Sequence, residues 1–91
     1  MPVTVQIPLA LTRFTKDKNE VKLRGKTVNE VVAALEKKFP QLRGKLVDET
    51  GNVKKFVKVF INRKDAAPLG GGQAAVADGD EITLIPAGLG G

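Results

Sequence analysis

The amino-acid composition restricts the chemistry that this chain can perform. Its 91 residues include no cysteine and no histidine, which excludes thiol nucleophiles, disulfide bonds, zinc fingers and acid–base catalysis by imidazole. Any chemistry must therefore use carboxylates, amines, hydroxyls or the ends of the chain. The C-terminal end is the candidate, because the sequence finishes with Gly90 and Gly91 after the short segment 87–89.

Two terminal glycines suit a carboxylate that reacts inside another protein. Glycine has no Cβ, so a glycine tail can pass through a narrow channel and adopt backbone angles that other residues avoid. It also leaves the terminal carbonyl unhindered. A pair of glycines at a chain end is equally compatible with an ordinary frayed terminus, so the preceding elements must decide between the two interpretations.

The first third of the chain predicts two strands. Apolar and polar residues alternate over residues 3–7, which is the period of a half-buried strand, and Pro8 ends it. The same alternation returns over residues 21–24. The polar cluster 15–19 between them is typical of a turn, so we expect the two strands to pair as a hairpin.

The clearest element is a helix over residues 28–38. Thr27 and Glu30 form a capping box, in which Glu30 reaches back to the Thr27 amide. One apolar stripe follows at helical spacing, and it comprises Val28, Val31, Val32, Leu35 and Phe39. The opposite face is assigned Asn29, Glu36 and Lys37, and Pro40 stops the helix.

Two more strands complete the expected domain. Residues 56–61 alternate strongly, and residues 81–86 form the last strand after the tight turn 78–80. The order strand, strand, helix, strand, strand predicts an α+β domain over residues 1–86, with one main helix on one face of a mixed four-stranded sheet. Placing the first and last strands side by side and parallel at the centre gives the β-grasp of ubiquitin-like proteins. Residues 87–91 are expected to be a flexible tail.

The segment from Asp78 to Ala87 carries a resemblance to a known family. An Asp-Gly-Asp turn starts the last strand, an isoleucine-rich strand follows, and Pro-Ala then runs into the terminal glycines. This pattern resembles the sulfur-carrier family of ThiS and of MoaD, the small subunit of molybdopterin synthase. The segment 56–62, with its closing asparagine, is most similar to the longer bacterial MoaD-like carriers, which include the carrier used in cysteine synthesis.

The resemblance implies a function for the C-terminal carboxylate. A partner enzyme of the ThiF or MoeB type would adenylate Gly91 with ATP, and a sulfur donor would convert the adenylate to a thiocarboxylate. The sulfur would pass to an accepting enzyme: the large subunit of molybdopterin synthase, thiazole synthase or cysteine synthase. The chain would then be a carrier, or a subunit of a sulfur-transferring synthase, and not an enzyme. It would bind no cofactor and no metal, since ATP is used by the partner.

The tail also departs from the family pattern. Gly90 and Gly91 match the functional end, and Leu89 and Gly88 are the residues expected to thread the partner's channel. The commoner pattern before the two glycines is small-x-small, whereas Leu89 is bulky and Gly88 replaces an apolar residue. The choice of activating enzyme and the receiving pathway therefore stay open.

A docking surface is expected on the sheet face that the helix leaves uncovered. Phe56 and Phe60 point away from the buried side of their strand, and Ile85 does the same in the last strand. An open apolar patch of this kind is unusual on a monomer and suits partner docking. The alternative is that the loop 66–77 folds over these three side chains.

Parts of the sequence are also compatible with other functions and sites. Gly91 could instead form isopeptide bonds with lysines, as ubiquitin-like modifiers do. The net charge of +5 would suit a small RNA-binding module, but no tyrosine or tryptophan is present for base stacking, so nucleic acid is not an expected partner. The glycines at 70–72 are interpreted as a flexible surface loop, and the acidic residues at 78, 80 and 81 as a turn and not a metal site.

The expected location is the cytoplasm. The N-terminal segment 1–6 lacks the basic region and apolar core of a signal peptide. No apolar stretch approaches the roughly 20 residues that a membrane-spanning helix needs, so no membrane partner is expected.

Overall fold

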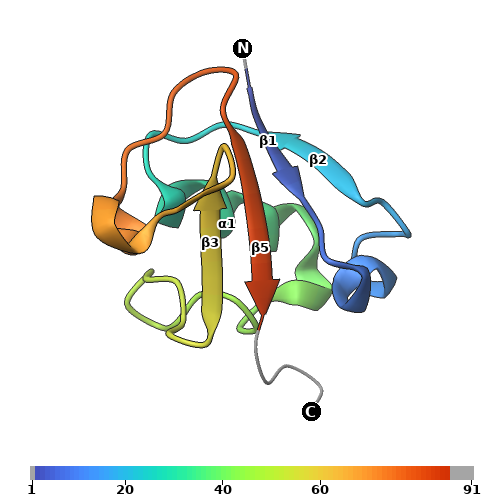
Figure 1. Cartoon of the computed structure of the whole chain (residues 1–91). Helices are drawn as coiled ribbons and strands as arrows, with labels where there is room; N and C mark the ends of the chain where they lie inside the picture. The colour runs from blue at the N-terminus through green and yellow to red at the C-terminus, as the bar shows by residue number, and fades with distance from the viewer. Residues whose placement is uncertain (1, 87–91) are drawn as a thin grey trace.

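The computed structural model describes residues 2–86, which form a five-stranded sheet with one α-helix packed behind it (Figure 1). The strands run in the order β2-β1-β5-β3-β4. The regular elements are β1 (Val3–Gln6), β2 (Glu20–Leu23), α1 (Val28–Lys38), β3 (Val57–Ile61), β4 (Lys64–Asp65) and β5 (Glu81–Pro86). Four short 3-10 helices connect them: η1 (Leu9–Phe14), η2 (Pro40–Leu42), η3 (Ala67–Leu69) and η4 (Gly71–Gln73). No helix within residues 2–86 is long and apolar enough to cross a membrane.

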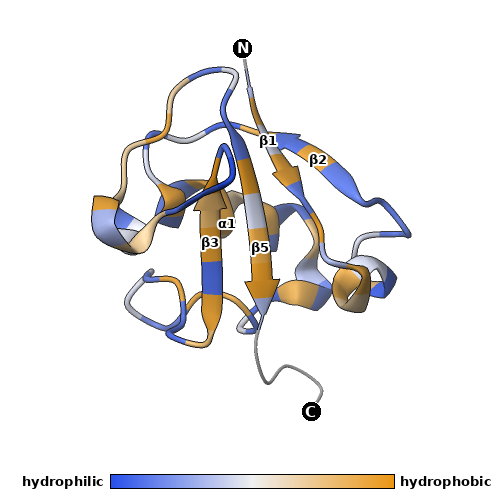
Figure 2. Cartoon of the chain, in the orientation of Figure 1, coloured by the Kyte–Doolittle hydropathy of each residue, from blue (hydrophilic) through white to orange (hydrophobic). Residues whose placement is uncertain are grey.

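The sheet confirms the predicted β-grasp arrangement. β1 pairs parallel with β5 and antiparallel with β2, while β5 pairs antiparallel with β3. Alternate residues of these strands point towards α1 and are buried. The outward residues of β1 and β2 are polar, whereas those of β3 and β5 include Phe60 and Ile85, so these two strands are mostly hydrophobic in Figure 2. The inward side chains of the sheet are Val3, Val5, Val21, Leu23, Val57, Val59, Ile61, Ile82 and Leu84.

The four-strand prediction missed one short strand. After β3 the chain turns back through Asn62 and Arg63, both with positive φ (51° and 72°), which is the geometry of a tight two-residue hairpin. Lys64 and Asp65 then pair with Ile61 and Phe60 as β4. A two-residue strand is too short to show alternation in the sequence.

The helix begins and ends where the sequence predicts. The Thr27 hydroxyl accepts a hydrogen bond from the Glu30 amide at 3.2 Å, which satisfies one of the free N–H groups of the first turn. The predicted capping box differs in one contact, because the Glu30 carboxylate accepts from the Lys26 amide at 3.0 Å and not from Thr27. At the other end the Phe39 amide still bonds to Leu35, and Pro40 cannot continue the helix.

The solvent-facing position assigned to Glu36 is wrong. Its side chain is 9% exposed, and its carboxylate accepts hydrogen bonds from three backbone amides of the following loop. The donors are Gly44 (3.1 Å), Leu46 (2.8 Å) and Val47 (2.8 Å). Glu36 therefore ties the loop after η2 to α1 and places Leu42 and Leu46 in the core, where both are fully buried. Lys37, assigned to the same face, is exposed.

The glycines at 70–72 also differ from the prediction of a flexible loop. Gly70 and Gly71 have positive φ (109° and 59°), and η4 lies against α1. An added Cβ at Gly72 would stand 2.2 Å from the Asn29 Oδ1 atom. This triplet is thus a close-packed turn, in which the lack of side chains permits the approach to α1.

Candidate functional site

The strand that leads to the C-terminus is the best-anchored strand of the sheet. β5 lies between β1 and β3, and its Ile82 and Leu84 side chains are 0% and 1% exposed. The β1 pairing stops at Thr83, whereas the β3 pairing continues to Pro86 opposite Val57. The chain beyond Pro86 therefore starts from a fixed point at one end of the sheet (Figure 1). The predicted tail residues Gly88, Leu89, Gly90 and Gly91 lie outside the described residues.

Two parts of the sequence motif contact each other at the opposite end of β5. The Asn62 side chain bonds to both residues at the start of β5. Its Nδ2 atom donates to the Asp80 carboxylate at 2.9 Å, and its Oδ1 atom accepts from the Glu81 backbone amide at 2.9 Å. The Asp80 carboxylate also accepts from the Ala77 amide at 2.8 Å. These contacts hold the start of β5 beside the end of β3. The motif residues here are structural and lie at the end of β5 farther from the tail.

The same contacts show that this acidic group forms a turn. Both Asp80 oxygens are engaged by N–H donors, and Glu81 accepts from the Gln6 side chain at 3.1 Å. Among the residues that the structure describes, no group of three or more acidic side chains is arranged to hold a metal ion. The pKa of Asp80 is lowered below its usual value, because two hydrogen bonds favour the ionised form. The bond from the Ala77 amide has the larger effect, and the bond from the Asn62 side chain has the next largest.

Replacing Asp80 by asparagine should reduce the acid sensitivity of folding. The pKa of Asp80 is lower in the folded chain, so its ionised form stabilises the fold above the usual pKa and this contribution is lost as the pH falls through the folded pKa. Because these hydrogen bonds are exposed to solvent, we expect Asp80→Asn to be less stable by only about 0.5–1.5 kcal/mol at neutral pH, with the difference shrinking in acid. Urea unfolding of both proteins across the acid range measures this, and a difference that is constant with pH would contradict it.

The uncovered sheet face carries the predicted apolar residues. Phe56 is 39% exposed and Ile85 is 49% exposed, while Phe60 is half-buried. Ile85 lies opposite Lys58 across the β3–β5 pair, and the two phenylalanines stand two positions to either side of Lys58. Phe60 is thus diagonal to Ile85, at about 7–8 Å. Phe56 lies in the turn just before β3, next to Val57, which pairs with Pro86 at the end of the sheet where the chain leaves β5.

The loop 66–77 does not cover this face. Its backbone bonds instead to the start of α1, where the Val28 amide donates to Ala74 at 3.1 Å and the Val76 amide donates to Lys26 at 3.0 Å. These contacts hold the loop beside the helix at the edge of the sheet (Figure 1). The alternative in which the loop buries the three apolar side chains is therefore wrong.

Sequence reasoning missed one charged feature of this face. The Lys58 ammonium forms an ion pair with the Asp65 carboxylate at 2.9 Å and lies 5.8 Å from the centre of the Phe60 ring. The pKa of Asp65 is lowered mainly by a hydrogen bond from the Ala67 amide and secondly by the hydrogen bond from Lys58. Asp65 belongs to β4, so the pair could not be recognised without that short strand. The result is an apolar surface in which an ion-paired lysine lies beside Phe60.

Comparison with known proteins identifies the same class of protein. The model of the ThiS family matches residues 5–91. The chain is 36% identical over 93 residues to the sulfur carrier protein CysO of Mycobacterium tuberculosis, covering 100% of both chains. It is 35% identical over 65 residues to small archaeal modifier protein 3 of Haloferax volcanii, covering 71% of this chain and 70% of that one.

A solved structure agrees in detail with this fold. The crystal structure of the Amycolatopsis orientalis BexX/CysO complex matches with a TM-score of 0.84 and 36% sequence identity, covering 98% of this chain and 99% of that chain. The similarity extends over the helix and the whole sheet and confirms the predicted ubiquitin-like fold. Because the family model matches nearly the entire sequence, the chain belongs to the ThiS family.

Proposed function

We propose that this protein carries sulfur as a thiocarboxylate on its C-terminal residue, Gly91. The sulfur-carrier role itself follows from membership of the ThiS family and from full-length relatives that are sulfur carriers. The observation that carries the proposal is the extent of the family match, which runs through Gly90 and Gly91. The anchored β5 supports it, because the reacting end starts from a rigid base at Pro86.

The chemistry requires activation by a second protein. A terminal carboxylate has a pKa of roughly 3.5, so it is ionised at neutral pH and is a poor electrophile. An adenylating enzyme of the ThiF or MoeB type would join the Gly91 carboxylate to the AMP part of ATP and release pyrophosphate. A sulfur donor would then displace AMP from the carbonyl. In this scheme ATP is bound by the partner, and the chain is the substrate and carrier and not the catalyst.

The thiocarboxylate would pass its sulfur to a third protein. The candidate acceptors are the large subunit of molybdopterin synthase, thiazole synthase and cysteine synthase. A related CysO has been crystallised with BexX, which supports assembly with a partner protein as part of this function. In this proposal Gly88 and Leu89 pass through the partner's channel together with the two terminal glycines.

Mass spectrometry of the intact chain tests the proposal directly. The chain is incubated with ATP, a persulfide sulfur donor, candidate adenylating enzymes from a cell that produces it, and excess thiol, which reduces the acyl disulfide left by persulfide attack to the thiocarboxylate. We expect the mass to rise by the difference between sulfur and oxygen, and the gain to require ATP. An unchanged mass with each of these enzymes would contradict the sulfur-carrier proposal.

We also propose that the surface formed by Phe56, Phe60 and Ile85 docks on the adenylating enzyme. Ile85→Glu should raise the KM of that enzyme for the carrier by about tenfold or more, because it places a charge in a desolvated contact. Leu69→Glu is the matched control, since Leu69 is an exposed apolar residue (59%) outside this surface. The rate of pyrophosphate release gives the KM for each variant. An equal effect of the two substitutions would count against the docking surface.

A second candidate function is protein modification through Gly91. It is favoured by the similarity to small archaeal modifier protein 3. Both functions begin with adenylation, but a modifier finishes in an isopeptide bond to a lysine of another protein. Blots of N-terminally tagged protein from cells separate them, because conjugates form a ladder that resists reducing agents, whereas a pure carrier gives only the free form.

A further inference from the structure

A basic cleft lies between η1 and the C-terminal end of α1. Its volume is about 200 Å³. Its walls carry three cationic side chains, namely Arg13, Lys16 and Lys38. The other lining residues are Phe14, Phe39, Pro40 and Gln41. Among the residues that the structure describes, none with a carboxylate side chain lines the cleft.

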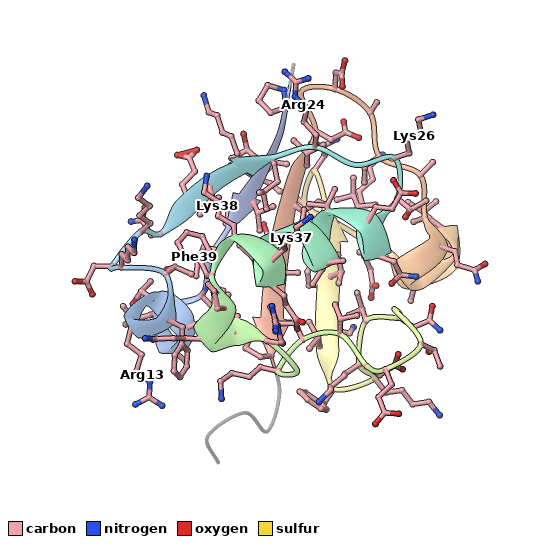
Figure 3. All side chains as sticks on the ribbon, turned by 180° about the vertical axis from the view of Figure 1, so that it is seen from behind. Arg13, Arg24, Lys26, Lys37, Lys38 and Phe39 are labelled. Atoms are coloured by element: carbon pink, nitrogen blue, oxygen red, sulfur yellow. The ribbon has the colours of Figure 1, made fainter. Side chains whose placement is uncertain are left out.

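The cations of this cleft have no carboxylate partner within residues 2–86. The only ion pair there is Lys58–Asp65, on the other face of the sheet. Arg13 instead lies over the Phe14 ring, 4.8 Å from its centre, and the Lys45 ammonium lies 4.9 Å from the same ring. Figure 3 shows Arg13, Lys38 and the neighbouring Lys37 on the helix side of the molecule. A concentration of unpaired positive charge attracts an anionic partner.

The wall formed by residues 13–16 is held in place. Thr15 is fully buried, and its hydroxyl donates to the Lys18 carbonyl at 2.7 Å. The Asp17 amide donates to Thr12 at 2.8 Å, which closes the turn. Asp17 belongs to this turn but does not line the cleft. A surface whose backbone is already ordered loses little conformational entropy when it binds.

We propose that this cleft binds an acidic segment of a partner protein. Two or three carboxylates on an extended segment would meet Arg13, Lys16 and Lys38 as exposed ion pairs. The end of α1 contributes a partial negative charge, which Lys37 and Lys38 in its last turn offset. Arg13 and Lys38 lie on either side of Phe39 in the view of Figure 3, so they suit carboxylates spread along an extended segment better than a small enclosed anion.

The aromatic side chains argue for a polypeptide and against a nucleic acid. Single-stranded RNA is bound largely by base stacking on exposed aromatic faces. Here Phe39 is 5% exposed, and the Phe14 ring is already occupied by Arg13 and Lys45. The cations remain available, but a stacking platform does not.

The position of the cleft suggests which partner would carry the acidic segment. η1 and η2 lie at the same end of the molecule as the end of β5 (Figure 1). A protein that receives the chain beyond Pro86 would approach this end, where the cleft lies on the helix side and the surface of Phe56, Phe60 and Ile85 lies on the other face of the sheet. This choice of partner rests on the proposed function, whereas the preference of the cleft for an acidic segment does not.

Nuclear magnetic resonance of the full, nitrogen-15-labelled chain tests the cleft without any enzyme. The probe is a decapeptide of alternating aspartate and glutamate, added at low salt. We expect the amide shifts to concentrate at residues 13–16 and at residues 38, 39 and 41. Arg13→Glu combined with Lys38→Glu should weaken binding by about tenfold, since each change replaces attraction by repulsion.

A control with the same change in net charge isolates the cleft. Lys55→Glu combined with Lys64→Glu reverses two exposed lysines on the β3–β4 side and should change binding by less than about twofold. Arg13→Gln combined with Lys38→Gln provides a milder variant if the charge-reversed protein does not give a folded spectrum. Equal losses in the control, or shifts spread over all lysines, would overturn the proposal. Tighter binding of a uridine decanucleotide at the same amides would also overturn it and assign the cleft to nucleic acid.

Discussion

Deleting Gly91 should abolish sulfur transfer while changing the free energy of unfolding by less than about 0.5 kcal/mol. Glycine has no side chain to remove from the core, and β5 ends five residues earlier, at Pro86. The deletion moves the terminal carboxylate back by one residue, or about 3.5 Å of extended chain. Reacting atoms must lie within about 3–3.5 Å of each other, so the shortened carboxylate cannot reach the phosphate of a bound ATP.

The measurement combines an adenylation assay with thermal unfolding. A chain extended by one residue after Gly91 is the matched control, because it keeps both glycines but moves the carboxylate outwards. We expect it to be equally inactive and equally stable unless a protease removes the extra residue. If the deleted protein is still adenylated and still supplies sulfur, the role proposed for Gly91 is wrong. If it unfolds at lower temperature, the glycine pair has a structural role.

Replacing Glu36 by alanine should lower the free energy of unfolding by about 3 kcal/mol. The carboxylate accepts from the Gly44, Leu46 and Val47 amides, and each buried donor left without an acceptor costs about 1–3 kcal/mol, with water replacing part of the loss. Leu42 and Leu46, which this contact places in the core, would also be less well held. The expected effect is comparable to that of Leu35→Ala, for which deletion of a fully buried leucine side chain costs roughly 2–5 kcal/mol.

Urea unfolding measures these changes, with Lys37→Ala as the control. Lys37 is the next residue of α1 and is exposed, so its replacement should change stability by less than about 0.5 kcal/mol. Glu36→Gln should fall between the two, because it keeps one acceptor oxygen and loses the other. If Glu36→Ala is as mild as Lys37→Ala, the loop after η2 is held by other contacts and the importance assigned to this carboxylate is wrong.

The sheet and helix could be predicted because their patterns are local. The alternation of apolar residues in β1, β3 and β5 predicts which side of each strand is buried. The apolar stripe of α1 predicts which face of the helix points inwards. The central parallel pair of β1 and β5 was the arrangement expected for such a sheet, and the strand pairing confirms it. β4 could not be predicted in this way, since its two residues are specified by the turn at Asn62 and Arg63 and by pairing with β3.

The surroundings of individual polar residues could not be predicted. Glu36 occupies a position that helical spacing assigns to the polar face, yet the loop 43–47 folds over it and supplies its hydrogen-bond donors. The motif residues Asn62 and Asp80 are eighteen positions apart and are joined by a hydrogen bond only in the folded chain. In both cases the partner is distant in sequence, and helical or strand periodicity contains no information about it.

The sequence by itself determined the class of protein, the order of its main elements and the chemical group on which the proposed function depends. These features are encoded in local patterns and in the motif that runs from Asp78 into the terminal glycines. Only the tertiary structure decided that the loop 66–77 leaves Phe56 and Ile85 exposed, that Glu36 is buried, and that Arg13, Lys16 and Lys38 line one cleft. The physical reason is that exposure and charge clustering depend on which distant segments pack together, and packing is a property of the whole fold.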